Sequence, residues 1–169
     1  MAREVRAYRY VGSEEIARHA QAAIERVQPT SAADIRAWAA RMKRSALECT
    51  YVVDSGGRLW LSDRRTEHVA CARGGEVLAA GELGLEVHPD RVEVTSVTNQ
   101  STGYCPEPDC WPAVRDALTG AGLAPSWGFT YAFRYRRCPT CRGINILKDE
   151  MPECPSCGTE LPAAWNLED

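Results

Sequence analysis

The residues with the clearest chemical spacing are four cysteines near the end of the chain. Cys138 and Cys141 form one C-x-x-C pair, and Cys154 and Cys157 form a second pair after twelve intervening residues. Two such pairs at this separation can bring four thiolates into the tetrahedron that Zn²⁺ prefers. Because four thiolates leave no open coordination position, we predict one structural zinc ion in a four-cysteine zinc ribbon, and no hydrolytic metal.

The residues around these cysteines suit such a ribbon. Pro139 and Pro155 restrict the backbone of each C-x-x-C turn. Gly143 and Gly158 are expected to permit backbone conformations and close approaches that a side chain would hinder. Residues 144–147 are of strand-forming types, so the segment between the two pairs is expected to contain a strand.

The other four cysteines, at positions 49, 71, 105 and 110, have no comparable spacing. We expect buried, reduced thiols there, and two alternatives stay open: a second metal site among Cys49, Cys71, Cys105 and Cys110, or a nucleophile at Cys105. The start of the chain is charged and lacks the apolar stretch of a secretory signal, and no apolar run approaches the ~18–20 residues of a membrane span. These features predict a cytoplasmic protein without membrane contact, in which thiols are kept reduced.

Two amphipathic helices are predicted in the first segment, residues 1–47. Ser13 can cap a helix in which Ile16, Ala20, Ile24 and Val27 recur at helical spacing. After Pro29, Ser31 and Asp34 fit a capping box for a second helix with an apolar stripe at Ile35, Trp38, Ala39 and Met42. We expect this pair to pack on a sheet. The alternative is a DNA-binding helix-turn-helix that presents Arg36, Arg41, Lys43 and Arg44.

The second segment, residues 48–135, is rich in predicted strands. A hairpin is expected over 50–62, where apolar runs flank an Asp-Ser-Gly-Gly turn. Further strands are expected over 77–80, 83–87 and 91–98, with a turn at 88–90, followed by a helix over 111–118 that stops at Gly120.

A last strand of this segment is predicted where Phe129, Tyr131, Phe133 and Tyr135 alternate with other residues. Burial against the sheet is the expectation for this aromatic face, and stacking of nucleic-acid bases is the alternative. With residues 136–169 as the zinc ribbon, the prediction is an α+β protein: N-terminal helices packed on a mainly antiparallel sheet, with a small C-terminal ribbon.

From Tyr51 to about Leu123, the order of residues resembles a domain of bacterial effector and polymorphic-toxin-like proteins and of plant calmodulin-binding proteins that carry an IQ motif. The family pattern is a hairpin, H-S-S, a glycine, V-x-x-A-G, N-x-S-G-H-Y-x-P and a helix. The matching positions here are His68, Gly74, Ala80, Gly81, Ser101, Tyr104 and Pro106.

This chain departs from the pattern at four positions. Val69 and Ala70 replace the two serines after His68, and Thr102 and Gly103 replace the glycine and histidine before the tyrosine. If the serines or the second histidine of the family pattern are catalytic, this chain lacks them and is a relative that binds a ligand without catalysis. No IQ-type helix is evident, so calmodulin is not carried over as a partner.

Four polar residues of the middle segment are the candidates for an active site: His68, Glu82, Ser101 and Tyr104. A histidine beside a hydroxyl could serve as a general base or could bind a phosphate or ribose hydroxyl. Each also has a structural interpretation, because turn residues hydrogen-bond their own backbone and a lone histidine is usually satisfied within the fold. No complete set of nucleophile, base and orienting group is evident, so whether the protein is an enzyme stays open.

Three functions follow, in order of preference. The first is a zinc-dependent, non-enzymatic binding or adaptor protein whose partner is another protein. The second is an effector-like enzyme that acts on a nucleotide, nucleic acid or protein through His68 with Ser101 or Tyr104. The third is a nucleic-acid-binding regulator, which the net charge of −3 disfavours, although the Arg-Tyr-Arg-Arg stretch at 134–137 is locally basic.

Overall fold

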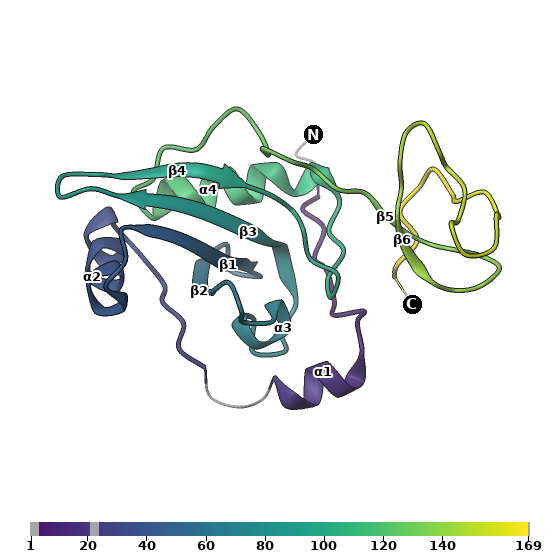
Figure 1. The fold of residues 1–169 in the computed structure, drawn as a ribbon, viewed down its shortest axis with the longest axis horizontal. Coiled ribbons are helices and arrows are strands. Elements are labelled where there is room, and N and C mark those ends of the chain that lie inside the picture. Colours follow the sequence, from purple (N-terminus) through teal and green to yellow (C-terminus); the bar gives the residue numbers. More distant parts are fainter. Residues whose placement is uncertain (1–3, 21–23, 169) are drawn as a thin grey trace.

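The computed structural model describes residues 4–20 and 24–168, which form helices around a mainly antiparallel sheet. The sheet has four strands in the order β2-β1-β3-β4, and every neighbouring pair is antiparallel (Figure 1). The strands are β1 (Ala46–Asp54), β2 (Leu59–Asp63), β3 (Val77–Val87) and β4 (Val92–Val97). The predicted α+β class is therefore confirmed.

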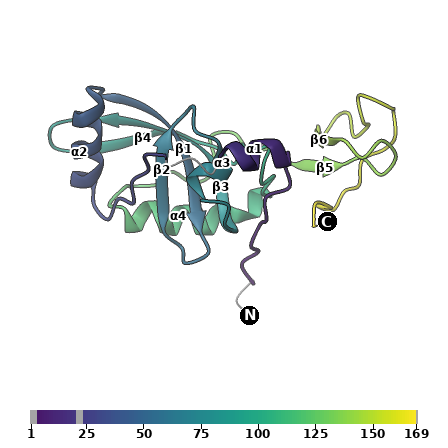
Figure 2. The ribbon, with the colours of Figure 1, turned by 90° about the horizontal axis from the view of Figure 1, so that it is seen from below.

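The main-domain helices cover the sheet in different places. They are α1 (Glu14–His19), α2 (Ala32–Met42), α3 (His68–Cys71) and α4 (Trp111–Gly120), which follows the 3₁₀ turn η1 (Pro108–Cys110). Figure 2 shows α4 lying along one face of the sheet, where Val114, Ala117 and Leu118 are buried. Gly120 does not stop this helix; it is the last helical residue, and Gly122 takes the left-handed conformation at φ 78°.

The hairpin predicted over 50–62 joins β1 and β2. Asp54 organises its turn, because Oδ1 accepts hydrogen bonds from the backbone N–H groups of Gly56 and Arg58. Gly57 has a φ of 79°, a left-handed conformation that favours glycine. The local sequence therefore determines this turn.

The two strands predicted over 77–80 and 83–87 are one continuous strand, β3. Gly81 and Glu82 do not interrupt it, because they pair with Tyr51 and Thr50 of β1. Glycine at position 81 has a packing reason: a Cβ there would collide with the backbone oxygen of Thr98. The predicted turn at 88–90 then connects β3 to β4.

The first helix is shorter than predicted. Ser13 caps it as expected, with Oγ accepting from the N–H of Glu15 at 3.2 Å, but the helix ends at His19. Val27 is not helical: it forms an antiparallel bridge with Leu61, with both N–H to O distances at 2.9 Å. Pairing with the free edge of β2 has outweighed the helical pattern of Ile24 and Val27. The extended stretch at 24–29 separates α1 from α2, so the two helices are not joined as a helix-turn-helix.

The second helix spans the predicted residues and buries Ile35, Trp38 and Ala39. Its cap differs in detail. The Ser31 side chain makes no capping hydrogen bond, whereas Asp34 Oδ2 accepts from the N–H and the hydroxyl of Thr30 at 2.9 and 3.1 Å. Asp34 therefore stabilises the start of α2 by accepting hydrogen bonds from Thr30, the residue before the N-cap.

The alternating aromatic strand predicted over 129–135 is wrong for most of its length. Of these four aromatic residues, Tyr135 alone lies in a strand, and Tyr131, which is 68% exposed, makes an isolated bridge with Thr98. Phe129 packs edge-on against Trp111, and Phe133 packs against Tyr135. Each aromatic side chain thus has a different local environment, and the four do not form one stacking face.

The C-terminal ribbon projects from the end of the sheet opposite α2 (Figures 1 and 2). It contains two short antiparallel strands, β5 (Tyr135–Arg137) and β6 (Ile144–Ile146). Its apolar core is small: Cys138, Cys154 and Leu161 are buried, and Leu147 is partly buried against them. So few apolar side chains bury too little surface to hold the ribbon by themselves.

Candidate metal centre and the predicted catalytic groups

The two C-x-x-C segments have the same backbone structure. In the first, the N–H of Cys138 donates to the oxygen of Gly143 at 2.8 Å, and the N–H of Arg142 donates to the oxygen of Cys138 at 3.0 Å. The same two bonds recur in the second, at 2.7 and 2.8 Å, among Cys154, Gly158 and Thr159. β5 and β6 flank the first turn, the bridge between Glu153 and Glu160 flanks the second, and the sulfur atoms of the two turns face one another.

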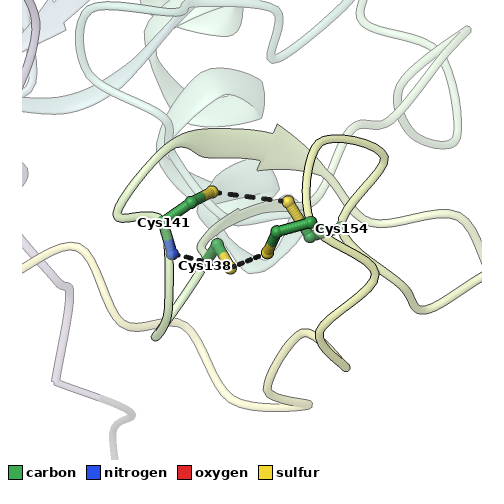
Figure 3. A group of neighbouring side chains, drawn as sticks. Cys138, Cys141 and Cys154 are labelled. Carbon is green, nitrogen blue, oxygen red and sulfur yellow. Dashed lines mark hydrogen bonds between the residues drawn. The ribbon is translucent and has the colours of Figure 1, made fainter.

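The sulfur atoms of the four cysteines lie close together. All four sulfur atoms lie within 4.8 Å of one another, and Figure 3 shows Cys138, Cys141 and Cys154 converging. Sγ of Cys138 lies 3.5 Å from Sγ of Cys157, and Sγ of Cys141 lies 3.6 Å from Sγ of Cys154. A tetrahedral ion with metal–sulfur bonds of ~2.3 Å separates its ligands by about 3.8 Å. The residues present therefore fit a four-coordinate metal ion, and the donor set is one that suits Zn²⁺.

Hydrogen bonds within the second C-x-x-C turn lower the pKa of the Cys154 and Cys157 thiols toward the charged form that a metal requires. Against the opposing effect of Gly143, hydrogen bonds to Cys154 and Cys138 raise the pKa of the Cys141 thiol to about 11. The hydroxyl of Thr159 lies 3.3 Å from Sγ of Cys157. Hydrogen bonds from the side chain and backbone of Thr159 lower the pKa of the Cys157 thiol to about 6. All eight cysteines are free.

The residue after each C-x-x-C pair takes a left-handed conformation. Arg142 has a φ of 65° and Gly158 a φ of 75°, at equivalent positions of the two turns. The expectation for Gly143 is therefore wrong, because Arg142 takes the left-handed position in the first turn. A Cβ at Gly143 would lie 3.6 Å from Sγ of Cys141, an ordinary contact.

Replacing Gly158 by alanine should lower the free energy of unfolding of the metal-bound ribbon by about 1 kcal/mol, because a side chain is strained at this φ. Urea unfolding of the metal-loaded protein measures the change. Gly143→Ala is the matched control and should change stability by less than about 0.5 kcal/mol. Equal losses from the two variants would contradict the assigned backbone geometry.

A buried ion pair fixes the ribbon to the main domain. The Arg136 side chain is 2% exposed, and its two terminal nitrogens lie 2.7 and 3.4 Å from the carboxylate oxygens of Glu107, whose side chain is 18% exposed. The same guanidinium donates to the backbone oxygens of Tyr135, Pro162 and Ala163. Arg136 therefore joins β5, the loop before η1 and the C-terminal tail.

The C-terminal tail makes a second attachment to the main domain. Trp165 donates its indole N–H to the oxygen of Cys105 at 2.8 Å and packs edge-on against Tyr8 at 5.4 Å between ring centres. Asn166 pairs with both backbone polar groups of Arg137, at 2.8 and 2.7 Å. Residues 161–167 therefore connect the second C-x-x-C turn to the main domain.

His68 is the first residue of α3 and is partly buried there. Its Nε2 donates to the backbone oxygen of Gly81 at 2.8 Å, which fixes the proton on that nitrogen. Burial lowers the pKa of the imidazole, against the opposing effect of this hydrogen bond. The contact holds α3 to β3.

The other three predicted catalytic residues lie at different places. Ser101 is buried, and its Oγ accepts from the N–H of Tyr104 at 3.2 Å. The Tyr104 hydroxyl donates to the backbone oxygen of Gly75 at 2.7 Å, and Glu82 is exposed on β3. Across residues 4–20 and 24–168, no hydrogen bond joins His68 to Ser101 or Tyr104. The identified hydrogen-bond partners of these three side chains are backbone groups.

The four remaining cysteines are buried. Burial raises the pKa of the thiols of Cys49, Cys105 and Cys110 to about 12, and that of Cys71 to about 11. Cys105 is therefore poorly suited to be a nucleophile, since the thiolate is the reactive form. Within the described residues, these four cysteines belong to no cluster of metal-binding side chains.

Protonation of His68 should make stability depend on pH. Its folded-state pKa lies below the unfolded value of about 6.5, so the unfolded chain binds the proton first as the pH falls. The free energy of unfolding should have its full value above pH ~6.5. It should fall as the pH is lowered from 6.5 to the folded-state pKa of His68. Urea unfolding between pH 7 and 5 measures this decrease.

His68→Gln is the informative comparison for this pH dependence. A glutamine amide can donate to Gly81 but does not titrate, so the decrease between pH 7 and 5 should be smaller in this variant. If His68→Gln retains the full slope, another group controls the pH dependence.

Sequence reasoning missed two groups of residues. The sequence shows Arg136 only as part of a locally basic stretch, and nothing in the local pattern identifies Glu107 as its partner 29 positions away. Glu86, His88 and Glu93 were also missed, although a signal was present: a Glu-x-His pair, a turn and a second glutamate place all three at one end of a hairpin.

Comparison of the sequence with family models gives no match, and no curated protein or solved structure matches the chain. In the described part of the chain, no helix combines the length and apolarity needed to cross a membrane. The function must therefore be argued from the sites themselves.

Proposed function

We propose that this chain is a zinc-binding, non-enzymatic binding or adaptor protein in which zinc holds the ribbon together. The proposal is carried by the four-thiol cluster, whose sulfur atoms all lie within 4.8 Å of one another. Four thiolates would complete the coordination of Zn²⁺ and leave no position for a substrate or an activated water. The ion would supply structure, and its two positive charges would offset part of the negative charge of the thiolates.

The hydrogen bonds of the predicted catalytic groups support the non-enzymatic part of the proposal. The side chains of His68 and Tyr104 donate to backbone oxygens of other segments, and Ser101 Oγ accepts from the N–H of Tyr104 in its own turn, as structural residues do. Catalysis by a histidine requires the reacting hydroxyl within direct or one-water reach. The identified contacts of His68 instead tie α3 to the sheet.

A protein partner is favoured over nucleic acid by the charges of the ribbon. Residues 134–169 contain five basic and six acidic residues. Arg136 is buried against Glu107, and Arg134 lies 3.2 Å from a carboxylate oxygen of Asp149, so two of the three arginines at 134–137 are already paired. A surface that binds phosphates needs free positive charge.

The metal part of the proposal is tested by the zinc content of purified protein. We expect one zinc ion per chain that is held tightly enough to survive purification, and loss of this ion in Cys141→Ser. Ser156→Ala changes an exposed residue of the second C-x-x-C turn that is not a ligand, and this variant should keep the metal. Absence of zinc from protein made in zinc-replete cells would contradict the proposal.

The non-enzymatic part is tested by complementing a deletion strain with the double variant His68→Gln/Tyr104→Phe. It keeps a donor near Gly81 but removes the imidazole base and the phenol hydroxyl. We expect full complementation by the double variant and none by Cys141→Ser. Loss of function in a double variant that still unfolds cooperatively would favour the enzyme hypothesis.

A further inference from the structure

The hairpin between β3 and β4 brings one imidazole and two carboxylates together. Glu86 and Glu93 stand directly opposite each other in the antiparallel register. His88 lies in the connecting turn, where its backbone N–H donates to the oxygen of Arg91 at 2.8 Å. One ligand atom from each of Glu86, His88 and Glu93 lies within 4.8 Å of the other two.

The charges at this hairpin are unbalanced. Like charges directly opposite on adjacent strands destabilise a sheet, and Glu86 and Glu93 are such a pair. The nearby cation is Arg91, whose guanidinium is shared between Glu93 Oε1 at 2.8 Å and Asp90 Oδ1 at 3.3 Å. Among the described residues, the ion pairs of this hairpin set three carboxylates against one guanidinium and the imidazole of His88, so the site is negative when the imidazole is neutral, and it then favours an added cation.

The imidazole nitrogen between the carboxylates is the second, independent sign of a ligand. The Nε2 atom of His88 is itself shielded from solvent and has no hydrogen-bond partner, while the His88 side chain as a whole is 27% exposed and those of Glu86 and Glu93 are 52% and 48% exposed. It lies 3.8 Å from Glu86 Oε1 and 3.5 Å from Glu93 Oε2, too far for hydrogen bonds of ~2.7–3.2 Å. Ligands of a tetrahedral ion with bonds of ~2.0–2.1 Å are separated by about 3.4 Å. The spacing therefore suits an ion between these atoms better than direct contact.

We propose that Glu86, His88 and Glu93 form a second metal site for a divalent transition ion such as Zn²⁺. One imidazole nitrogen and two carboxylate oxygens are a donor set that such ions accept. Arg91 supports the site, because it binds Oε1 of Glu93 and leaves Oε2 directed toward His88. Three protein ligands leave a position for water or an added ligand, so this site differs in chemistry from the closed four-thiol cluster.

The test is a zinc titration of the intact protein that already holds one equivalent of zinc in the ribbon. A chromophoric chelator of micromolar affinity competes for the added Zn²⁺. We expect the wild-type protein to bind a second equivalent, and His88→Ala to bind it at least tenfold more weakly while it keeps the first. His19→Ala, which removes an exposed histidine of α1, should behave as wild type and controls for adventitious binding.

Glu93→Gln gives an independent check if His88→Ala is poorly folded. Its amide oxygen can still accept from Arg91, while its amide nitrogen replaces the ligand oxygen, so binding of the second equivalent should again weaken at least tenfold. Cobalt substitution adds a spectroscopic readout: the second equivalent should lack the thiolate-to-cobalt absorption of the first. The proposal is overturned if wild type binds no second equivalent, or if both variants bind it as tightly as wild type.

Discussion

Removal of the metal from the reduced protein should unfold the ribbon while the four-stranded sheet stays folded. Among the described residues, the ribbon buries Cys138, Cys154 and Leu161 around the cysteines, and Tyr135 and Leu167 where it meets the main domain, which is too little apolar surface to offset the entropy of ordering the chain. In zinc-finger peptides, metal binding supplies about 10–16 kcal/mol of apparent free energy, which is also their folding free energy. Hydrogen exchange with and without a strong chelator measures the result, at the N–H groups of Cys138, Arg142, Cys154 and Gly158.

The controls separate metal loss from other causes of unfolding. A reducing agent without chelator should change nothing, since all eight cysteines are free. Cys154→Ser should reproduce the effect of the chelator, and Ser156→Ala should not. If the ribbon amides stay protected after the metal is removed, packing alone holds the ribbon and the metal is not structural.

Features that depend on neighbouring residues could be predicted from the sequence. The two C-x-x-C pairs each close a local turn, so their spacing alone predicted the sulfur cluster that the structure contains. The β1–β2 hairpin also depends on local chemistry, because Asp54 and Gly57 form its turn. In both cases the determining contacts lie within a few positions of each other.

Features that depend on distant partners were missed or misjudged. Val27 has a helical pattern with the residues before it, but the free edge of β2 offered it two backbone hydrogen bonds with Leu61. Phe129 and Phe133 alternate as strand residues do, yet each packs on a different aromatic neighbour. The spacing of apolar residues shows which secondary structures a segment can adopt, whereas tertiary contacts decide which of them it adopts.

The candidate catalytic residues show the same limit. Their residue types were compatible with chemistry, and the sequence could not identify the groups to which they would bond. His68 bonds to Gly81, and Tyr104 bonds to Gly75, at sequence separations of 13 and 29 residues. A backbone oxygen can come from any residue type, so such partners leave no signal in composition or spacing.

The variant Arg136→Met should lower the free energy of unfolding by about 3–5 kcal/mol. Methionine keeps most of the length of the side chain but removes its charge. Removing one member of a buried ion pair leaves the other charge without a partner in a poorly solvated site. The carboxylate of Glu107 would lose its bidentate partner, and the backbone oxygens of Pro162 and Ala163 would each lose a donor. Urea unfolding followed by tryptophan fluorescence measures the change, since Trp165 lies in the same tail.

Arg134→Met is the matched control, two positions away on the same segment. The Arg134 side chain is 52% exposed and pairs with the exposed Asp149, so this variant should lose less than about 1 kcal/mol. The double variant Arg136→Met/Glu107→Met should recover part of the loss, because no unpaired charge is then buried. Zinc content should stay at one ion per chain in all three variants, since neither arginine is a ligand. Equal losses from Arg136→Met and Arg134→Met would show that Arg136 does not fix the ribbon to the main domain.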